Sequence, residues 1–146
     1  MKIFMLGALL LPLVLMAQTK KTTKSASVKT TTSSIAQTSI QRGQVIYKTH
    51  CLTCHQADGG GVGTLNPPFV QQWAGGEKSR IIHMILKGSV GKVEIEGDNF
   101  SNTMPAQPAF TDQQIADVLT YVRNNFGIKA SAVTAAEVKA VRAKTK

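Results

Sequence analysis

The stretch Cys51-Leu52-Thr53-Cys54-His55 decides how the rest of this chain is interpreted. It has the form C-x-x-C-H, in which two thiols lie three positions apart and a histidine follows directly. Thiols with this spacing can add to the two vinyl groups of one haem, and the adjacent imidazole can then bind the iron. Cys51 and Cys54 are also the only cysteines of the sequence. The motif therefore predicts one covalently attached haem c, with His55 as the proximal iron ligand.

Three other uses of these residues stay open on spacing alone. His50 and the motif together offer four zinc ligands, although structural zinc sites normally draw on two separated ligand pairs. A redox-active dithiol expects a βαβ context, and none surrounds this motif. A disulfide across two intervening residues would be strained, and it would leave His55 without a role.

The net charge of +9 is concentrated at the two ends of the 146-residue chain. Residues 1–38 contain five lysines and no acidic residue, and residues 129–146 contain five basic residues and one glutamate. Residues 39–128 contain seven basic and seven acidic residues. A nucleic-acid-binding protein needs a basic patch on a folded surface, so the charge pattern predicts no nucleic-acid partner. Basic tails of this kind can contact an acidic surface, including that of a membrane.

The N-terminus has the pattern of an export signal. Met1-Lys2 is followed by an apolar run to Ala17, which is shorter than the roughly 20 residues that a membrane-spanning helix needs. Residues 1–17 are therefore interpreted as a signal peptide cut near Ala17, which predicts a periplasmic protein. An uncleaved N-terminal membrane anchor is the alternative. Residues 18–38, rich in Thr, Ser and Lys, are expected to form a disordered tether.

The remaining sequence predicts mainly helices. One helix is expected from Thr38 or Ser39 to the motif, with Gly43 inside it, where glycine costs about 1 kcal/mol relative to alanine. A second is expected over residues 77–87. The clearest begins at Thr111, whose sequence to Gln114 forms a capping box. Residues 129–146 form a basic tail in which Thr134 could begin a short helix or which could fray.

The segments between these helices contain features of their own. Residues 56–69 are rich in glycine and proline, which excludes regular structure. Residues 92–102 alternate apolar and charged positions about a Gly97 turn, which predicts a small β-hairpin. Met104 follows in a loop with two prolines, outside any amphipathic helix, and is therefore a candidate ligand. For His83 and Met84, which lie inside the second helix, we expect packing and not ligation.

The order of these elements resembles the class I cytochrome c family over residues 39–128. The resemblance implies an all-α cytochrome c fold, with three to four helices around one covalently bound haem and a small β-hairpin before the distal methionine. Gly43 and Tyr47 match the family's glycine and aromatic, which cross the terminal helix at Val118 and Tyr121. The resemblance implies roles for two further residues. The carbonyl of Pro67 would accept the N–H of the proximal imidazole, and Met104 would be the distal iron ligand.

The function implied by this resemblance is electron transfer and not catalysis. The expected protein is a periplasmic carrier, with one haem cycling between Fe(II) and Fe(III). Apolar residues expected around the haem are Phe69, Trp73, Ile81, Ile85 and Leu86. The segment from Gly91 to Met104 resembles cytochrome domains attached to bacterial dehydrogenases and copper-containing reductases. We therefore expect a monomer whose partners are redox enzymes on separate chains. The alternative is a haem-based sensor in which small ligands displace Met104.

Overall fold

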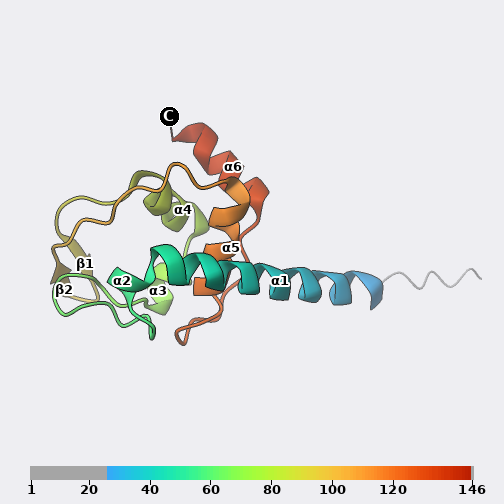
Figure 1. Ribbon diagram of the computed structural model, residues 1–146, viewed down its shortest axis with the longest axis horizontal. Coiled ribbons are helices and arrows are strands. Elements are labelled where there is room, and N and C mark those ends of the chain that lie inside the picture. Colours follow the sequence, from blue (N-terminus) through green and yellow to red (C-terminus); the bar gives the residue numbers. More distant parts are fainter. Residues whose placement is uncertain (1–25, 146) are drawn as a thin grey trace, which may run out of the picture.

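The computed structural model describes residues 26–145, and the signal-peptide interpretation of residues 1–17 lies outside this range. Helices dominate, with one two-stranded hairpin, as the sequence predicted (Figure 1). The described elements follow in this order: α1 (Ala26–His50), α2 (Leu52–His55), α3 (Gln71–Ala74), α4 (Lys78–Lys87), β1 (Val93–Ile95), β2 (Asp98–Phe100), α5 (Asp112–Val122) and α6 (Ala135–Lys144). None of the helices within residues 26–145 is both long enough and apolar enough to cross a membrane.

The helices α1 and α5 cross in contact with each other, and Gly43 is the reason that they can. A Cβ atom placed on Gly43 would collide with the backbone carbonyl of Asp117 and with the side chain of Tyr121. Four positions after Gly43, the buried ring of Tyr47 packs against Tyr121 with their ring centroids 5.3 Å apart. The sequence prediction of a close helix crossing at Gly43 is therefore confirmed.

The start of α1 differs from the prediction. The helix begins at Ala26 and not near Thr38 or Ser39, so residues 26–38 of the predicted disordered tether are helical, whereas residues 18–25 lie outside the described range. The helix continues past the docked part because each added residue gains a backbone hydrogen bond once a helical nucleus exists. Figure 1 shows the N-terminal half of α1 projecting beyond the other elements.

The segment from α4 to the hairpin agrees with the prediction. Glu77 caps α4, its carboxylate accepting hydrogen bonds from the backbone N–H groups of Ser79 and Arg80. The hydroxyl of Ser79 also donates to this carboxylate at 2.6 Å, and this side-chain hydrogen bond is the main cause that lowers the pKa of Glu77, followed by the backbone bonds. The strands β1 and β2 are antiparallel, with Val93 opposite Phe100. The hairpin thus directs the chain from α4 back toward Met104.

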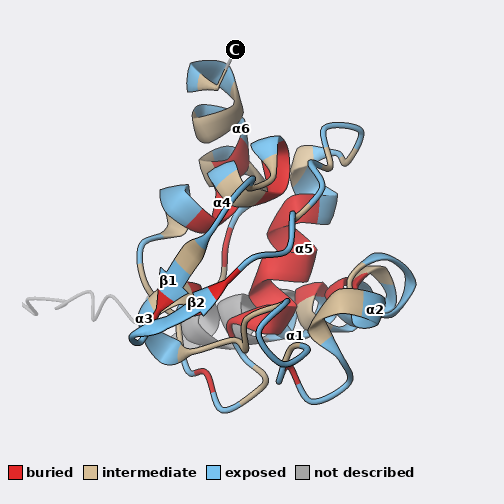
Figure 2. Ribbon diagram, turned by 90° about the vertical axis from the view of Figure 1, so that its left-hand side faces the viewer, coloured by how far each residue is buried: buried red, intermediate tan, exposed pale blue. Residues whose placement is uncertain are grey.

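The helix α5 forms the centre of the molecule, and Figure 2 shows it as the most completely buried element. Thr111 and Gln114 make the reciprocal hydrogen bonds of the predicted capping box. Every residue from Ile115 to Val122 is buried. One face of α5 lines a cavity through Val118, Leu119 and Val122. Another face contacts the C-terminal segment, where Thr120 is hydrogen-bonded to the backbone of Val133.

The C-terminal segment is a docked helix, so its description as a basic tail beyond residue 128 is incomplete. Thr134 and Glu137 form a second capping box at the start of α6, and Val138 is completely buried. Lys78 of α4 lies 2.8 Å from Glu137. Arg142 contacts Asp112 at 2.7 Å and also donates to the carbonyls of Pro108 and Phe110. The spacing of apolar residues in α6 did not predict this docking. Several of the contacts are made by charged side chains, which a pattern of apolar residues does not reveal.

Candidate functional site

The motif residues are presented by one short helical turn. The helix α1 ends at His50, and α2 continues after Cys51 with hydrogen bonds from the backbone N–H groups of Cys51 and His55 to Tyr47 O and Cys51 O, both at 2.9 Å. The turn stops at Gln56, whose φ of 61° lies outside the right-handed helical region. The buried hydroxyl of Tyr47 donates to Gln56 O at 2.6 Å and holds this chain reversal in place.

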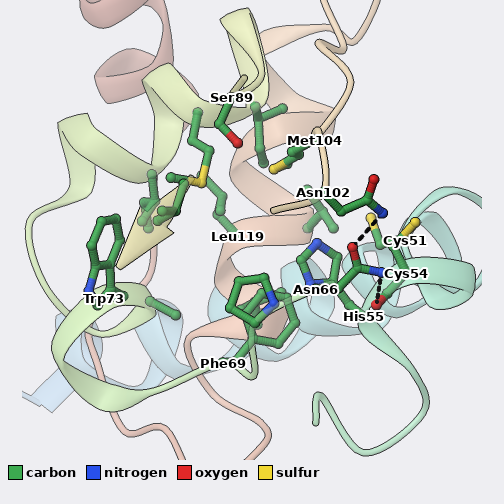
Figure 3. A pocket seen from close by; sticks show the side chains of 18 of the residues that line it. Cys51, Cys54, His55, Asn66, Phe69, Trp73, Ser89, Asn102, Met104 and Leu119 are labelled. Atoms are coloured by element: carbon green, nitrogen blue, oxygen red, sulfur yellow. Dashed lines mark hydrogen bonds between the residues drawn. The ribbon is translucent and has the colours of Figure 1, made fainter. Parts of the chain in front are cut away.

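A mostly apolar cavity lies beside the motif, and the predicted ligands converge on it. Cys51, Cys54 and His55 line it from one part of the chain, and Met104 lines it from another (Figure 3). Phe69, Trp73, Ile81 and Ile85 belong to its wall, as predicted, whereas Leu86 is buried elsewhere in the core and does not. The cavity can therefore enclose a large, flat apolar group between His55 and Met104.

The imidazole of His55 is half-buried and stacked against an aromatic ring. Its ring stacks on Phe69 with a centroid distance of 4.5 Å and an interplanar angle of 15°. Burial lowers the pKa of His55, which favours the neutral form that metal binding requires. Its Nδ1 atom is buried without a hydrogen-bond partner among the described residues.

Pro67 lies in the wall of the cavity, in the same loop as Phe69. No hydrogen bond joins its carbonyl to His55 within residues 26–145, so the predicted bond stays a prediction. The loop is tightly folded at this point, because a Cβ atom on Gly61 would collide with the carbonyls of Asn66 and Pro67. Gly61 also has a φ of 70°, so both the lack of space for a Cβ atom and the backbone conformation favour glycine at this position.

The two cysteines are not joined by a disulfide and lie half-buried at the edge of the cavity. Burial, with a smaller contribution from Cys54, raises the pKa of Cys51 to about 11. Among the described residues, no three His, Cys, Asp or Glu side chains are grouped in a way that could hold a metal ion. His50 instead packs edge-on against Phe110, with ring centroids 5.0 Å apart, and His83 is exposed on α4.

The opposite side of the site is fixed by the end of α4. Ser89 and Met104 exchange two backbone hydrogen bonds of 3.0 Å, which form an isolated antiparallel bridge. Gly88, at a φ of 71°, ends α4 and approaches the Met104 carbonyl so closely that a Cβ atom would not fit. Gln107 N donates to Ile85 O at 2.8 Å. The backbone on both sides of Met104 is thus held against α4.

Some residues of the cavity were not recognised from the sequence. Met84, for which only packing was expected, lines the cavity, as does Phe110. Asn66 and Asn102 also line it and are bonded to each other at 2.7 Å. These two asparagines lie in loops, where no periodic pattern marks a residue as inward-facing, so only the folded structure brings them together.

Comparisons with known proteins agree with this geometry. Residues 40–126 match the family described as Cytochrome c. The chain is 33% identical over 110 residues to the gluconate 2-dehydrogenase cytochrome c subunit of Pantoea cypripedii, a match that covers 70% of this chain and 24% of that protein. It is 32% identical over 111 residues to the cytochrome c subunit of the quinone alcohol dehydrogenase of Gluconacetobacter polyoxogenes, covering 68% of this chain and 22% of that protein.

A third relative has a length closer to that of this chain. Cytochrome c-552 of Thermus thermophilus is 31% identical over 112 residues, which cover 70% of this chain and 85% of that protein. The chain therefore spans less than a quarter of the two dehydrogenase subunits but most of the length of this single small protein.

Proposed function

Because the chain belongs to the cytochrome c family, with its covalently bound haem c and its role in electron transfer, we propose that it is an exported one-electron carrier. In this proposal Cys51 and Cys54 would hold the haem through two thioether links, and His55 and Met104 would supply protein ligands to its iron. The observation that carries the proposal is the convergence of all four side chains on one apolar cavity. The haem, when bound, supplies an iron that gains and loses a single electron.

The protein's residues favour the ferrous state in two ways. Met104 offers a soft thioether, and His55 and methionine together give high potentials in haem proteins. The apolar wall, which includes Phe69, Ile81 and Ile85, excludes water and disfavours the additional positive charge of the ferric state. His55 is kept neutral by burial and is oriented by its stacking on Phe69. These features support reversible electron transfer without a substrate site at the iron.

We further propose that the protein acts in the periplasm and exchanges electrons with a redox enzyme and a terminal acceptor on separate chains. The composition of residues 1–17 supports export. The similarity to cytochrome subunits of dehydrogenases supports a dehydrogenase as one partner. Contacts between redox proteins are commonly small and transient, which fits a monomeric carrier.

The axial ligands are tested by absorption spectroscopy of the reduced, exported protein with and without carbon monoxide. We expect a low-spin spectrum that carbon monoxide leaves unchanged, because His55 and Met104 would both be bound to the iron. Met104→Ala should bind carbon monoxide readily. If the unmutated protein binds it equally well, the carrier proposal is wrong and a ligand sensor becomes the better account.

The covalent links are tested by haem staining after denaturing electrophoresis. The unmutated protein should retain its haem, and the double variant Cys51→Ala/Cys54→Ala should lose it. The exposed His83→Ala is a matched control, since this imidazole lies outside the cavity. Retention of haem by the double variant would contradict the assignment of the thioethers.

A further inference from the structure

A continuous chain of side-chain amides joins the two sides of the cavity (Figure 3). Thr103 N donates to Asn102 Oδ1 at 3.0 Å. Asn102 Nδ2 donates to Asn66 Oδ1 at 2.7 Å, and Asn66 Nδ2 donates to Cys54 O at 3.1 Å. Each amide is used once as donor and once as acceptor, and the bonds therefore run in a single direction from Thr103 to Cys54.

The two ends of this amide chain lie next to the proposed axial ligands. Thr103 immediately precedes Met104, and Cys54 immediately precedes His55. Backbone hydrogen bonds run parallel to the amides, from Ser101 N to Thr64 O at 3.3 Å and from Asn102 N to Leu65 O at 3.1 Å. The loop that carries Met104 is consequently attached to the loop that follows His55, in addition to its attachment to α4 through Ser89.

We propose that Asn66 and Asn102 are positioning residues that hold the Met104 loop closed over the cavity and so limit the displacement of Met104 by external ligands. The proposal rests on the proposed function, because it takes Met104 as the distal ligand. A movement of its loop away from the cavity would carry Met104 with it. On the α4 side, backbone bonds from Ser89 and Gln107 restrain the loop. On the side of the motif, the amide chain is the only side-chain connection to Cys54 among the described hydrogen bonds.

The exposure of the two residues separates this role from a general contribution to folding. Asn102 is exposed and Asn66 is half-buried, so neither fills a part of the apolar core. Loss of their bond exposes groups that water can then satisfy, which keeps the effect on global unfolding small. Hydrogen bonds aligned in a chain strengthen one another. We therefore expect that loss of the Asn66–Asn102 bond mainly makes the Met104 loop easier to open.

The test measures the binding of free imidazole to the ferric, haem-loaded protein. Asn102→Asp keeps an oxygen for Thr103 N but cannot donate to Asn66. We expect it to raise the apparent association constant of imidazole about fivefold, the factor that corresponds to one net hydrogen bond. Asn102→Ala and Asn66→Ala provide independent variants, and their combination should give less than the product of the single effects because both remove the same bond. Wild-type affinity in all of these variants would overturn the proposal.

Two further variants complete the design. Asn124→Ala removes an exposed asparagine whose amide donates to Thr120 O at 2.8 Å, away from the cavity, and it should bind imidazole as the wild type does. In a Met104→Ala background, Asn102→Asp should have no effect, because no methionine remains to be displaced. An undiminished effect there would overturn the positioning role. Failure of the proposed function is separately visible, because the wild type would then bind imidazole as tightly as Met104→Ala, and the positioning role would fall with it.

Discussion

The carboxylate of Asp117 accepts two hydrogen bonds from the guanidinium of Arg42, at 2.6 and 2.8 Å, and so ties α5 to α1. Ser39 and Gln113 donate to the same buried carboxylate. This cluster lies beside the contact of Gly43 with the Asp117 backbone. Asp117 thus contributes to the helix crossing behind the cavity through both its backbone and its side chain.

We predict a specific pH dependence for Asp117. Burial alone would raise the pKa of this carboxyl, but hydrogen bonds from Arg42, Ser39 and Gln113 outweigh burial and lower it. Because the pKa in the folded state lies below the unfolded value of about 3.9, the stabilisation is complete above that value and is lost as the pH falls through the folded pKa. Asp117→Asn should reduce the free energy of unfolding at pH 7 by about 1.5–3 kcal/mol.

Urea unfolding of the haem-loaded protein at several pH values measures this effect. The difference between wild type and Asp117→Asn should shrink as the pH is lowered from about 5 toward 3. Asp98→Asn, an exposed change in β2, is the control and should leave the profile unchanged. A difference that stays constant across this range would exclude the ionised carboxylate as its source.

The variant Gly43→Ala should destabilise the protein despite the higher helix propensity of alanine. The propensity gain is about 1 kcal/mol, but the new methyl group meets a backbone carbonyl, which cannot rotate away, so α1 or α5 must shift. Such overpacking costs about 1–3 kcal/mol, and the crowded contact places this variant at the upper end. Urea unfolding measures the net loss, with the exposed neighbour Gln44→Ala as a nearly neutral control. Equal or higher stability of Gly43→Ala would show that the helices can separate at little cost.

The variant Tyr47→Phe isolates the hydrogen bond that ends the motif turn. The ring contacts with Tyr121 and Phe126, at 5.3 and 5.2 Å, are kept. The loss of the hydroxyl leaves Gln56 O without its donor, and we expect about 1 kcal/mol of destabilisation. Thermal unfolding compares it with Tyr121→Phe, which removes a hydroxyl that makes no hydrogen bond within the described residues. The prediction fails if both variants melt together.

The variant Val138→Ala tests whether α6 belongs to the core. Val138 is completely buried, so the lost methyl groups and the cavity left behind should cost about 1.5–3 kcal/mol. The exposed neighbour Lys139→Ala should have little effect. Urea unfolding provides the measurement, and the visible spectrum should be the same in both variants because Val138 does not line the cavity. An unchanged midpoint for Val138→Ala would mean that α6 is attached only loosely.

The parts of the fold that the sequence predicted are those with a local cause. The spacing of Cys51 and Cys54 follows from the shape of one helical turn, and Thr111 and Gln114 cap a helix through their own side chains. Gly43 was informative because glycine is unfavourable within a helix. Its presence there indicated that another helix approaches too closely for a side chain. Met104, which lines the cavity, could be singled out because it lies next to a proline outside any helical stripe.

The parts that the sequence did not predict depend on contacts between distant segments. Residues 26–38 have no apolar stripe, so their helix could not be expected without the docked turns that follow. The buried guanidinium of Arg123 donates to the carbonyls of Ala74, Gly76 and Ser131, an arrangement that no local pattern announces. The Asn66–Asn102 bond joins positions 36 residues apart in two irregular loops, where side-chain direction has no period to follow.

The contacts of Arg142 bear on where the C-terminal boundary of a shortened version of this protein should lie. The homologous match stops at residue 126, yet Arg142 binds the carbonyls of Pro108 and Phe110 in the segment that leads from Met104 to α5. A minimal version trimmed to residue 126 would therefore lose one of the attachments of the segment that follows Met104. For this chain, the range of the family match and the range of residues that pack on the core therefore differ, and the second extends through α6 to Lys144.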